Sequence, residues 1–246
     1  MIAVGAVLIG AYIALYYSSL FTITDVRVSG NNVLQSSYVL NMAEVDPNST
    51  FLRTDTESIK ARLLTETWIQ NVEVERVFPS TLVLHITERP VAARVSIVPE
   101  TANDSSSVWI IADDGVWISE IEVENEGGVI LEAEQFVKIP RIKDVSAAVR
   151  PVSGELETDE GIRNALALLH GFSPEMRAMV STISAPDAVK TQLTLYNNVG
   201  VAFGAAVDIE AKEKAIATLL AEHEGTITFI NVRVPERATF RATDSP

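Results

Sequence analysis

The sequence predicts an α+β protein in which a single N-terminal transmembrane helix precedes two small folded domains. Three observations favour this fold class. Residues 1–21 contain no charged side chain. Residues 68–90 alternate apolar and polar side chains on both sides of a proline turn, which is typical of an antiparallel hairpin with one buried face. Residues 92–240 continue in strand and helix patterns and are long enough for a second domain.

The uncharged stretch at residues 1–21 is predicted to cross a membrane. About 20 helical residues, at a rise of about 1.5 Å each, cross a hydrocarbon core about 30 Å thick. Tyr16 and Tyr17 lie near one end, where an amphipathic ring suits the headgroup zone. A cleaved signal peptide and a buried core helix are the alternatives. The stretch lacks the basic start and the small-residue cleavage site of a signal peptide, and its apolar run is too long for one.

Residues 22–91 are expected to form the first domain, in the order strand, helix, helix, strand, strand. The first strand, at residues 23–28, ends at Gly30, because glycine tolerates positive φ. Helices are expected at residues 35–43 and after Thr54, where a capping-box spacing begins. Two helices on one face of the sheet would bury the apolar residues of the hairpin, which are Val72, Val74, Leu82, Leu84 and Ile86.

Several short motifs of this domain point to one family. They are Val26-x-Val28-x-Gly30-Asn31, Trp68-Ile69, Val72-x-Val74-x-Arg76-x-Phe78-Pro79-x-Thr81-Leu82 and Glu88-Arg89-Pro90-Val91-Ala92. Following a membrane helix, this arrangement resembles the POTRA domain of the FtsQ/DivIB family of bacterial cell-division proteins. Structural roles are expected for its conspicuous side chains: Trp68 in the core, and Arg76 and Arg89 in a cross-strand charge pattern with nearby glutamates.

Residues 92–240 are expected to form the second domain, and residues 241–246 a C-terminal tail. Its expected strands are residues 95–98, 108–112, 116–118, 136–140, 192–196, 201–203 and 226–234. Its expected helices are a helix capped by Thr158 or Asp159 that runs to about residue 170, a helix that begins at Ser173-Pro174, and residues 209–222. Asp113-Asp114-Gly115 and Asn197-Asn198-Val199-Gly200 are expected turns, and residues 120–134 an acidic loop.

The end of the second domain also resembles the FtsQ/DivIB family. The matching residues are Leu193-x-Leu195, Val201-x-Phe203-Gly204, Lys214 and Ile230-Asn231-Val232-Arg233-Val234-Pro235, although the family often has Asp where Asn231 stands. The resemblance implies a divisome scaffold that recruits and links cell-division proteins at the septum, with membrane partners of FtsB/FtsL type. It also implies that the POTRA domain serves septal localisation. The implied location is the bacterial inner membrane, crossed once, with most of the chain outside the cytoplasm.

The last expected strand is the candidate partner-binding site, because a strand at a sheet edge can pair with a strand of another chain. The candidate contact residues are Thr226, Thr228, Phe229, Ile230, Asn231, Val232, Arg233 and Val234. Alternation would place the even-numbered residues on one face, and Ile227, Phe229, Asn231 and Arg233 on the other. Phe229 would anchor a partner and Arg233 would meet its acidic side chains. The same pattern fits a central, buried strand equally well.

Composition argues against several other classes of function. The 246-residue chain has a net charge of −14, which disfavours nucleic acid as a partner, and it contains no cysteine. His85, His170 and His223 fall in separate elements without zinc-binding spacing, and no phosphate-binding loop or nucleophile elbow occurs. We therefore expect a protein that is not an enzyme and that uses no cofactor, no metal and no small-molecule substrate.

Two alternatives remain open at the level of sequence. The first is a chaperone or secretion component of the cell envelope, because POTRA domains also occur in such proteins. These usually carry tandem copies before a β-barrel, and no barrel-length series of strands follows here. The second is an enzyme with scattered carboxylates such as Asp113, Asp114 and Glu132, which would need a concave pocket to bring them together.

Overall fold

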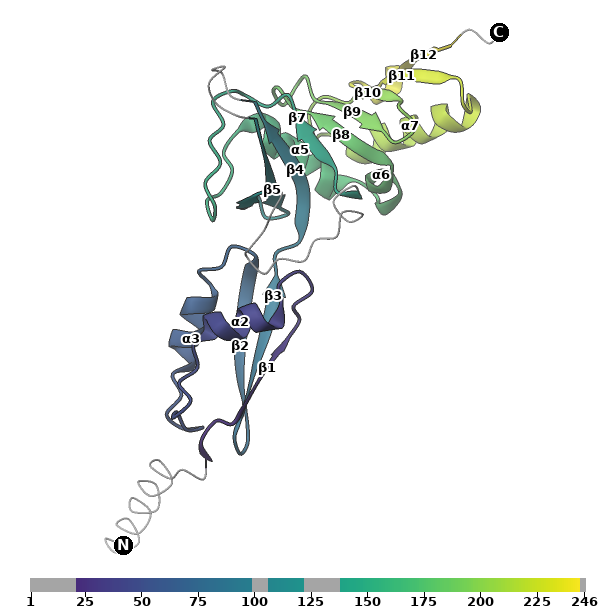
Figure 1. The fold of residues 1–246 in the computed structure, drawn as a ribbon. Coiled ribbons are helices and arrows are strands. Elements are labelled where there is room, and N and C mark those ends of the chain that lie inside the picture. The colour runs from purple at the N-terminus through teal and green to yellow at the C-terminus, as the bar shows by residue number, and fades with distance from the viewer. Residues whose placement is uncertain (1–20, 99–105, 122–137, 244–246) are drawn as a thin grey trace, which may run out of the picture. The chain divides into compact units, whose positions relative to one another are not determined.

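The computed structural model describes residues 21–98, 106–121 and 138–243 (Figure 1). The chain divides into two compact units, of which the first ends at Arg89 and the second begins at Pro90. Apart from Phe21, the predicted transmembrane helix lies outside the described residues. Within the described ranges, no helix is long and apolar enough to cross a membrane. Most of the predicted acidic loop, residues 122–134, also lies outside them.

The first unit contains a three-stranded sheet, formed entirely within residues 21–89, with helices in the chain order that was predicted. Its elements are β1 (Asp25–Ser29), α2 (Ser36–Ala43), α3 (Thr56–Leu63), β2 (Ile69–Val77) and β3 (Thr81–Glu88). The strand order is β1-β3-β2, with β1 parallel and β2 antiparallel to the central β3. The predicted hairpin is therefore β2 and β3, and the α+β fold class is confirmed.

Apolar side chains of α2 and α3 and those of the sheet form the core of this unit. The buried members include Val39, Ile59 and Leu63 from the helices and Val72, Leu82, Leu84 and Ile86 from the strands. The prediction was wrong only for Val74, which is half-buried. Val74 lies toward the end of β2, where the next three residues are all exposed, so the core does not extend that far along the strand.

Gly30 and Glu88, two residues of the family motifs, lie where the loop after β1 meets the end of β3. Gly30 has φ +82°, and a Cβ atom there would collide with the carbonyl oxygen of Ile86. The Glu88 carboxylate accepts backbone N–H groups at 2.8–3.0 Å; the donors are Asn32, Val33 and Leu34. Both residues therefore position the loop between β1 and α2 against the end of β3.

Among the described residues, the second unit forms a nine-stranded mixed sheet, the large sheet. In sheet order the strands are β12 (Thr239–Ala242), β11 (Ile227–Asn231), β10 (Gly200–Ala202), β9 (Gln192–Leu195), β8 (Val180–Ser184), β7 (Arg141–Lys143), β4 (Val91–Ile97), β5 (Ser107–Ala112) and β6 (Trp117–Glu120). The helices are α5 (Glu160–Gly171), α6 (Pro174–Met179), α7 (Ile209–Glu222) and the short 3-10 helix η2 (Pro235–Arg237).

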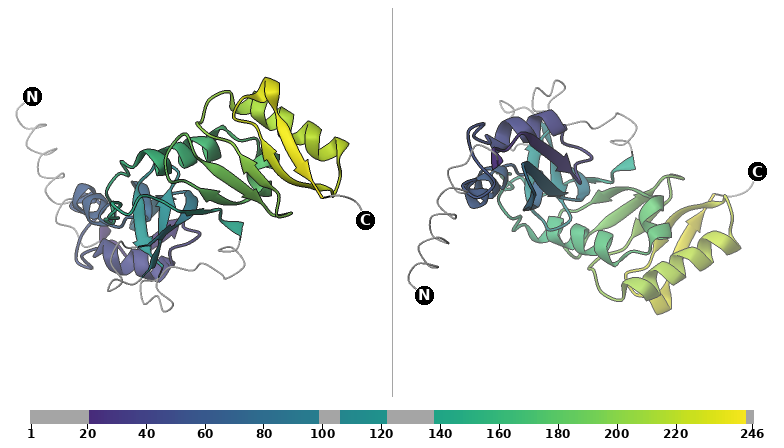
Figure 2. Two further views of the ribbon diagram at one scale, coloured as in Figure 1. Left: turned by 90° about the horizontal axis from the view of Figure 1, so that it is seen from above. Right: turned by 90° about the horizontal axis from the view of Figure 1, so that it is seen from below.

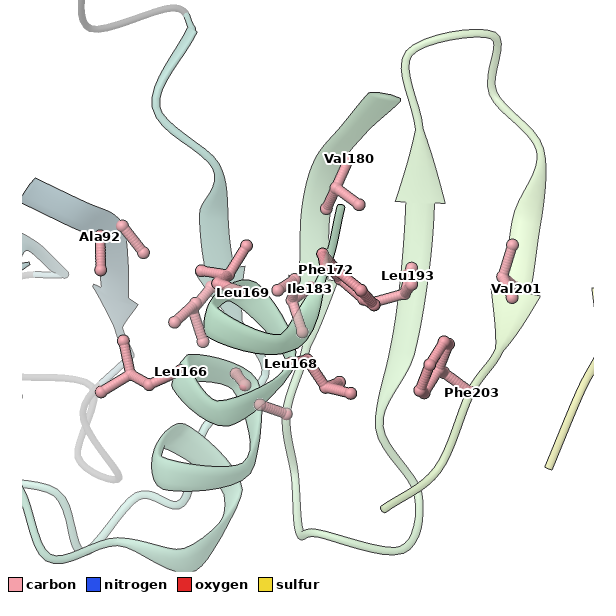
Figure 3. Close-up of a cluster of buried hydrophobic side chains, with 14 of the residues drawn as sticks. Ala92, Leu166, Leu168, Leu169, Phe172, Val180, Ile183, Leu193, Val201 and Phe203 are labelled. Atoms are coloured by element: carbon pink, nitrogen blue, oxygen red, sulfur yellow. The ribbon is translucent and has the colours of Figure 1, made fainter. Parts of the chain in front are cut away.

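The core of the second unit lies between α5, α6, α7 and one face of the large sheet. Side chains of α5, α6 and α7 belong to the same buried cluster as strand residues from β4 to β11. Figure 3 shows Leu168 of α5 and Phe172 meeting Ile183, Leu193 and Phe203. The Phe172 and Phe203 rings pack edge to face with centroids 5.4 Å apart. Figure 2 shows α5 and α7 along the same side of the sheet.

Most predicted elements of this unit are confirmed. Helix α7 has the predicted bounds, and Asp159 and Ser173 cap α5 and α6 with their side chains. The hairpins β5–β6 and β9–β10 pair as predicted. The prediction of a strand at 136–140 was wrong for residues 138–140, which are the part that the structure describes. The strand there, β7, begins after Pro140 instead. The Pro140 carbonyl accepts the Arg94 amide, and pairing with β4 begins at Arg141.

Candidate functional site

The C-terminal end of the large sheet contains all the predicted partner-binding residues. Strand β11 lies between β10, to which it is parallel, and β12, to which it is antiparallel. The predicted strand was too long at both ends, since β11 covers only Ile227–Asn231. The chain turns away because the Asn231 side chain accepts the Arg233 amide and Pro235 opens η2. Thr226, Val232, Arg233 and Val234 therefore lie just outside the strand.

A β-bulge changes the predicted faces of β11. The pairing with β12 slips between Ile227 and Phe229, so that Thr228 is the extra residue. Ile227 and Ile230 are consequently both buried in the core, although strict alternation placed them on opposite faces. Val232 is buried with them, as predicted for the face of Ile230.

The candidate residues that remain accessible occupy distinct positions. Phe229 is half-buried: it pairs with Gly200 of β10, and the Arg241 guanidinium lies 5.0 Å from its ring centroid. Thr228 is exposed, and its hydroxyl donates to the Arg241 carbonyl at 3.3 Å. Asn231 is half-buried and Val234 is 52% exposed.

The outermost strand at this end of the sheet is β12, and β11 is internal. The interpretation of residues 226–234 as the edge strand was therefore wrong, because β12 forms the edge. All four residues of β12 are exposed, and its inner side pairs with β11. Beyond it, the Thr243 amide donates to the Thr226 carbonyl at 2.8 Å. Thr239-Phe240, shortly after a proline turn, is a weak signal for β12, whereas residues 241–246 were expected to form a tail.

Helix α7 is fixed to this end of the sheet by a buried lysine that sequence reasoning missed. Lys212 is only 1% exposed, and its ammonium group donates to the carbonyls of Phe203 at 3.2 Å and Ala205 at 2.9 Å. Burial lowers the pKa of Lys212. The family resemblance singled out Lys214, which is exposed. The usable signal was spacing, because Lys212 lies four residues before Ile216 on the inward helix face.

Arg241 lies in the edge strand β12, and Arg233 and Arg237 lie in the segment that precedes it in the chain. Arg233, Arg237 and Arg241 are exposed, and no ion pair joins any of them to another described residue. Beside them, Ala215 and Leu219 of α7 and Pro235 of η2 line a groove of about 460 Å³. In a chain of net charge −14, this end therefore combines apolar contact with three arginines, although Glu236 also lines the groove.

The carboxylates considered for an enzyme have structural partners instead. The Asp113 carboxylate accepts from Arg177 at 3.1 Å, and His170 lies 3.8 Å away. The Asp114 side chain accepts the Val116 amide, which is a turn contact. Glu132 lies outside the described residues, and the described part of the chain contains no group of three residues that could hold a metal.

A serine, a histidine and a glutamate do meet on the sheet of the first unit. His85 lies 2.8 Å from the Ser29 hydroxyl and 2.9 Å from the Glu75 carboxylate. The His85 and Glu75 side chains are 44% and 60% exposed, so the arrangement encloses no substrate. Ser29, His85 and Glu75 lie on three adjacent strands, and we interpret them as a cross-strand polar row.

Comparison with known proteins agrees with the fold of the first unit and with the predicted family resemblance. Residues 21–89 match the family model described as a POTRA domain, FtsQ-type. The chain is 26% identical over 215 residues to the cell division protein FtsQ of Mycobacterium tuberculosis. It is 24% identical over 222 residues to that of Mycolicibacterium smegmatis and 26% identical over 222 residues to that of Streptomyces collinus. The resemblance to the FtsQ/DivIB family is confirmed.

The matches to these FtsQ proteins cover most of this chain but less of each relative. They include 87% of the chain for the M. tuberculosis protein and 90% for the other two. The share of the relative is 60% for M. tuberculosis, 58% for M. smegmatis and 78% for S. collinus. The chain therefore spans about 60% of the length of the mycobacterial relatives.

Within the FtsQ-type POTRA domain, the conspicuous motif residues have structural contacts. Trp68 is buried, as predicted. Arg76 and Arg89 were expected in a charge pattern with nearby glutamates, but each donates a hydrogen bond to a backbone carbonyl. Arg76 donates to the Thr54 carbonyl at 2.7 Å, and Arg89 donates to the Thr67 carbonyl at 2.9 Å. The motif arginines thus hold loops of the domain in place.

Proposed function

We propose that the protein is a membrane-anchored divisome scaffold that recruits and links cell-division proteins at the septum. The observation that carries the proposal is the exposed edge strand β12, flanked by arginines that have no carboxylate partner among the described residues. The similarity to proteins named cell division protein FtsQ supports the cellular process. The exposed strand edge and the arginines near it fit binding of another protein.

The proposed anchor is the uncharged segment at residues 1–21, which would cross the bacterial inner membrane once. Its length and composition support this assignment, and the FtsQ-type POTRA domain begins directly after it, at residue 21. Both folded units would then lie outside the cytoplasm. There they would meet partners that are themselves anchored in the same membrane.

The proposed binding mode is addition of a partner strand to β12. An edge strand has N–H and C=O groups that a second chain can pair with, and neighbouring side chains then select that chain. Phe229 and Phe240 would supply apolar contact, and Arg233, Arg237 and Arg241 would favour acidic side chains. The buried residues Ile227, Ile230 and Val232 would hold β11 in place beneath the contact. Divisome membrane proteins of FtsB/FtsL type are the proposed partners.

Co-purification of the full chain with an FtsB-type partner tests this proposal. Phe229→Asp should abolish co-purification, because it removes an apolar ring from the contact surface and offers Arg241 a carboxylate of its own chain in place of the partner's. A truncation after Ala238 removes β12 with the residues that follow it and should have the same effect. Leu156→Asp is the matched control, since Leu156 is 63% exposed and bridges Val116 beside β6, at the opposite edge of the sheet.

A fold control accompanies each variant. The thermal unfolding of both units should be retained, so that lost binding reports the surface and not the fold. Arg241→Glu offers a milder change at an exposed position and should weaken binding at least tenfold. Unchanged partner binding by both Phe229→Asp and the Ala238 truncation would discard β12 as the recruitment site.

A further inference from the structure

An apolar patch is exposed at the end of the POTRA unit where the described chain begins. The patch consists of Phe21, Phe51, Leu52, Val77 and Phe78, and is called here the aromatic tip. Phe78 is 68% exposed, Leu52 46% and Val77 40%. The Phe78 ring centroid lies 5.5 Å from that of Phe21 and 5.9 Å from that of Phe51. Figure 1 shows the β2–β3 turn and the start of the described chain at the same end of the unit.

Backbone hydrogen bonds hold the three segments of the aromatic tip together. The Phe51 amide donates to the Phe21 carbonyl at 2.8 Å, and the Ile23 amide donates to the Ser49 carbonyl at 3.0 Å. The Thr24 amide donates to the Ser80 carbonyl at 2.9 Å. The exposed Phe78 ring and the half-buried Phe21 and Phe51 rings are therefore carried by a bonded scaffold at the end of the sheet, and not by a free loop.

We propose that the aromatic tip inserts into the headgroup layer of the lipid bilayer. This inference rests on the proposed function, because it takes residues 1–21 as the membrane-spanning segment. Headgroups add about 5 to 7 Å to each side of the hydrocarbon core. Phe21 ends the spanning segment, and the Phe78 ring lies 5.5 Å from it, so continuity of the chain sets the tip at headgroup depth.

The chemistry of the aromatic tip fits a lipid surface. Phenylalanine and leucine are typical of the apolar side of segments that lie in the interface. The exposed Arg53 follows Leu52 at the border of the tip. Such a cation is attracted to anionic headgroups, and Asp25 near the turn is paired with Arg27 at 2.6 Å. A second attachment beside the helix would limit how far the POTRA unit tilts on the membrane.

Single-cysteine labelling of the full chain tests this inference, and the absence of native cysteine makes each label unique. Phe78→Cys, Leu52→Cys, Val189→Cys and Ala14→Cys would each carry a nitroxide in vesicles of phosphatidylcholine and phosphatidylglycerol. Collision with oxygen reports lipid, and collision with a water-soluble nickel chelate reports water. Val189 is the matched control, since its exposed fraction of 68% equals that of Phe78. Leu52→Cys gives a second reading at the same patch in case Phe78→Cys fails to fold.

The expected result is an oxygen-to-nickel ratio at residues 78 and 52 that lies between those at Ala14 and Val189 and is several-fold above the latter. A ratio like that at Val189, with the Ala14 label in lipid, would overturn the inference and leave the anchor intact. Shielding of the tip labels from both reagents would also overturn it, because protein would then cover the patch. An Ala14 label in water would reject the proposed anchor and this inference together.

Discussion

The arginines of the POTRA unit and those at the C-terminal end of the large sheet differ in what they bind. In the POTRA unit, Arg62, Arg76 and Arg89 donate to backbone carbonyls of their own unit. At the end of the sheet, the guanidinium groups of Arg233 and Arg237 donate to no described residue. The Arg241 guanidinium lies over the Phe229 ring. The first set stabilises a fold, whereas the second is free to bind another molecule.

The residues that identify the family are therefore different from the residues proposed to bind a partner. The motifs that identify the POTRA domain fall on residues with internal contacts, such as Gly30 against Ile86 and Glu88 on backbone amides. A family can therefore be identified by residues whose contacts lie within the domain. The residues proposed for recruitment lie instead on a short edge strand whose pattern is hard to distinguish from a tail.

The largest expected effect tests the internal contacts of the POTRA unit. Gly30→Ala should destabilise it by about 3 kcal/mol or more, because a Cβ collides with the Ile86 carbonyl at a positive φ. Gly225→Ala is the matched control: its φ is +77° and a Cβ there meets nothing within 4 Å. It should cost about 1 kcal/mol. Urea unfolding of both variants measures the difference, and equal losses would contradict the role given to Gly30.

Glu88→Gln should have the next largest effect. It removes a carboxylate that accepts the backbone N–H groups of Asn32, Val33 and Leu34, and should cost about 2 kcal/mol. Glu73 is exposed on β2 of the same sheet, so Glu73→Gln should change the unfolding free energy by less than about 0.5 kcal/mol. A loss at Glu73 as large as that at Glu88 would remove the argument for this loop contact.

A third prediction compares two lysines of α7. Lys212→Met leaves the Phe203 and Ala205 carbonyls without their donor and should cost about 2 kcal/mol at pH 7. Lys214→Met, at an exposed position two residues on, should stay within about 0.5 kcal/mol of the unchanged protein. Chemical unfolding monitored by tryptophan fluorescence gives both values. Comparable losses would mean that the buried ammonium group contributes nothing specific.

The pH dependence of the Lys212 contribution has a defined sign. Burial lowers the pKa of Lys212 in the folded state from its ordinary value of 10.5. Between the lowered pKa and 10.5, the unfolded chain binds more protons than the folded protein. The stability of the unchanged protein relative to Lys212→Met should therefore rise as pH increases through this window. A difference that falls there would show that the folded protein favours the charged amine.

Local patterns predicted most of the fold and less of the candidate site. Helix α7 and the β2–β3 hairpin follow from spacing and turn residues within one segment. The bulge at Thr228 and the short β12 arise from pairing between strands, which periodicity in one strand does not encode. Lys212 was missed for a related reason, because its partners are carbonyls in a preceding loop.

Site-specific photo-crosslinking in dividing cells tests the recruitment surface most directly. A photoreactive residue at Phe240, which is 39% exposed on β12, is compared with one at Leu156, near the opposite edge of the sheet. We expect Phe240 to crosslink to a division protein of FtsB/FtsL type, Leu156 to give no such product, and Phe229→Asp to remove the Phe240 product. Crosslinking of that partner from Leu156 but not from Phe240 would contradict recruitment at the edge strand.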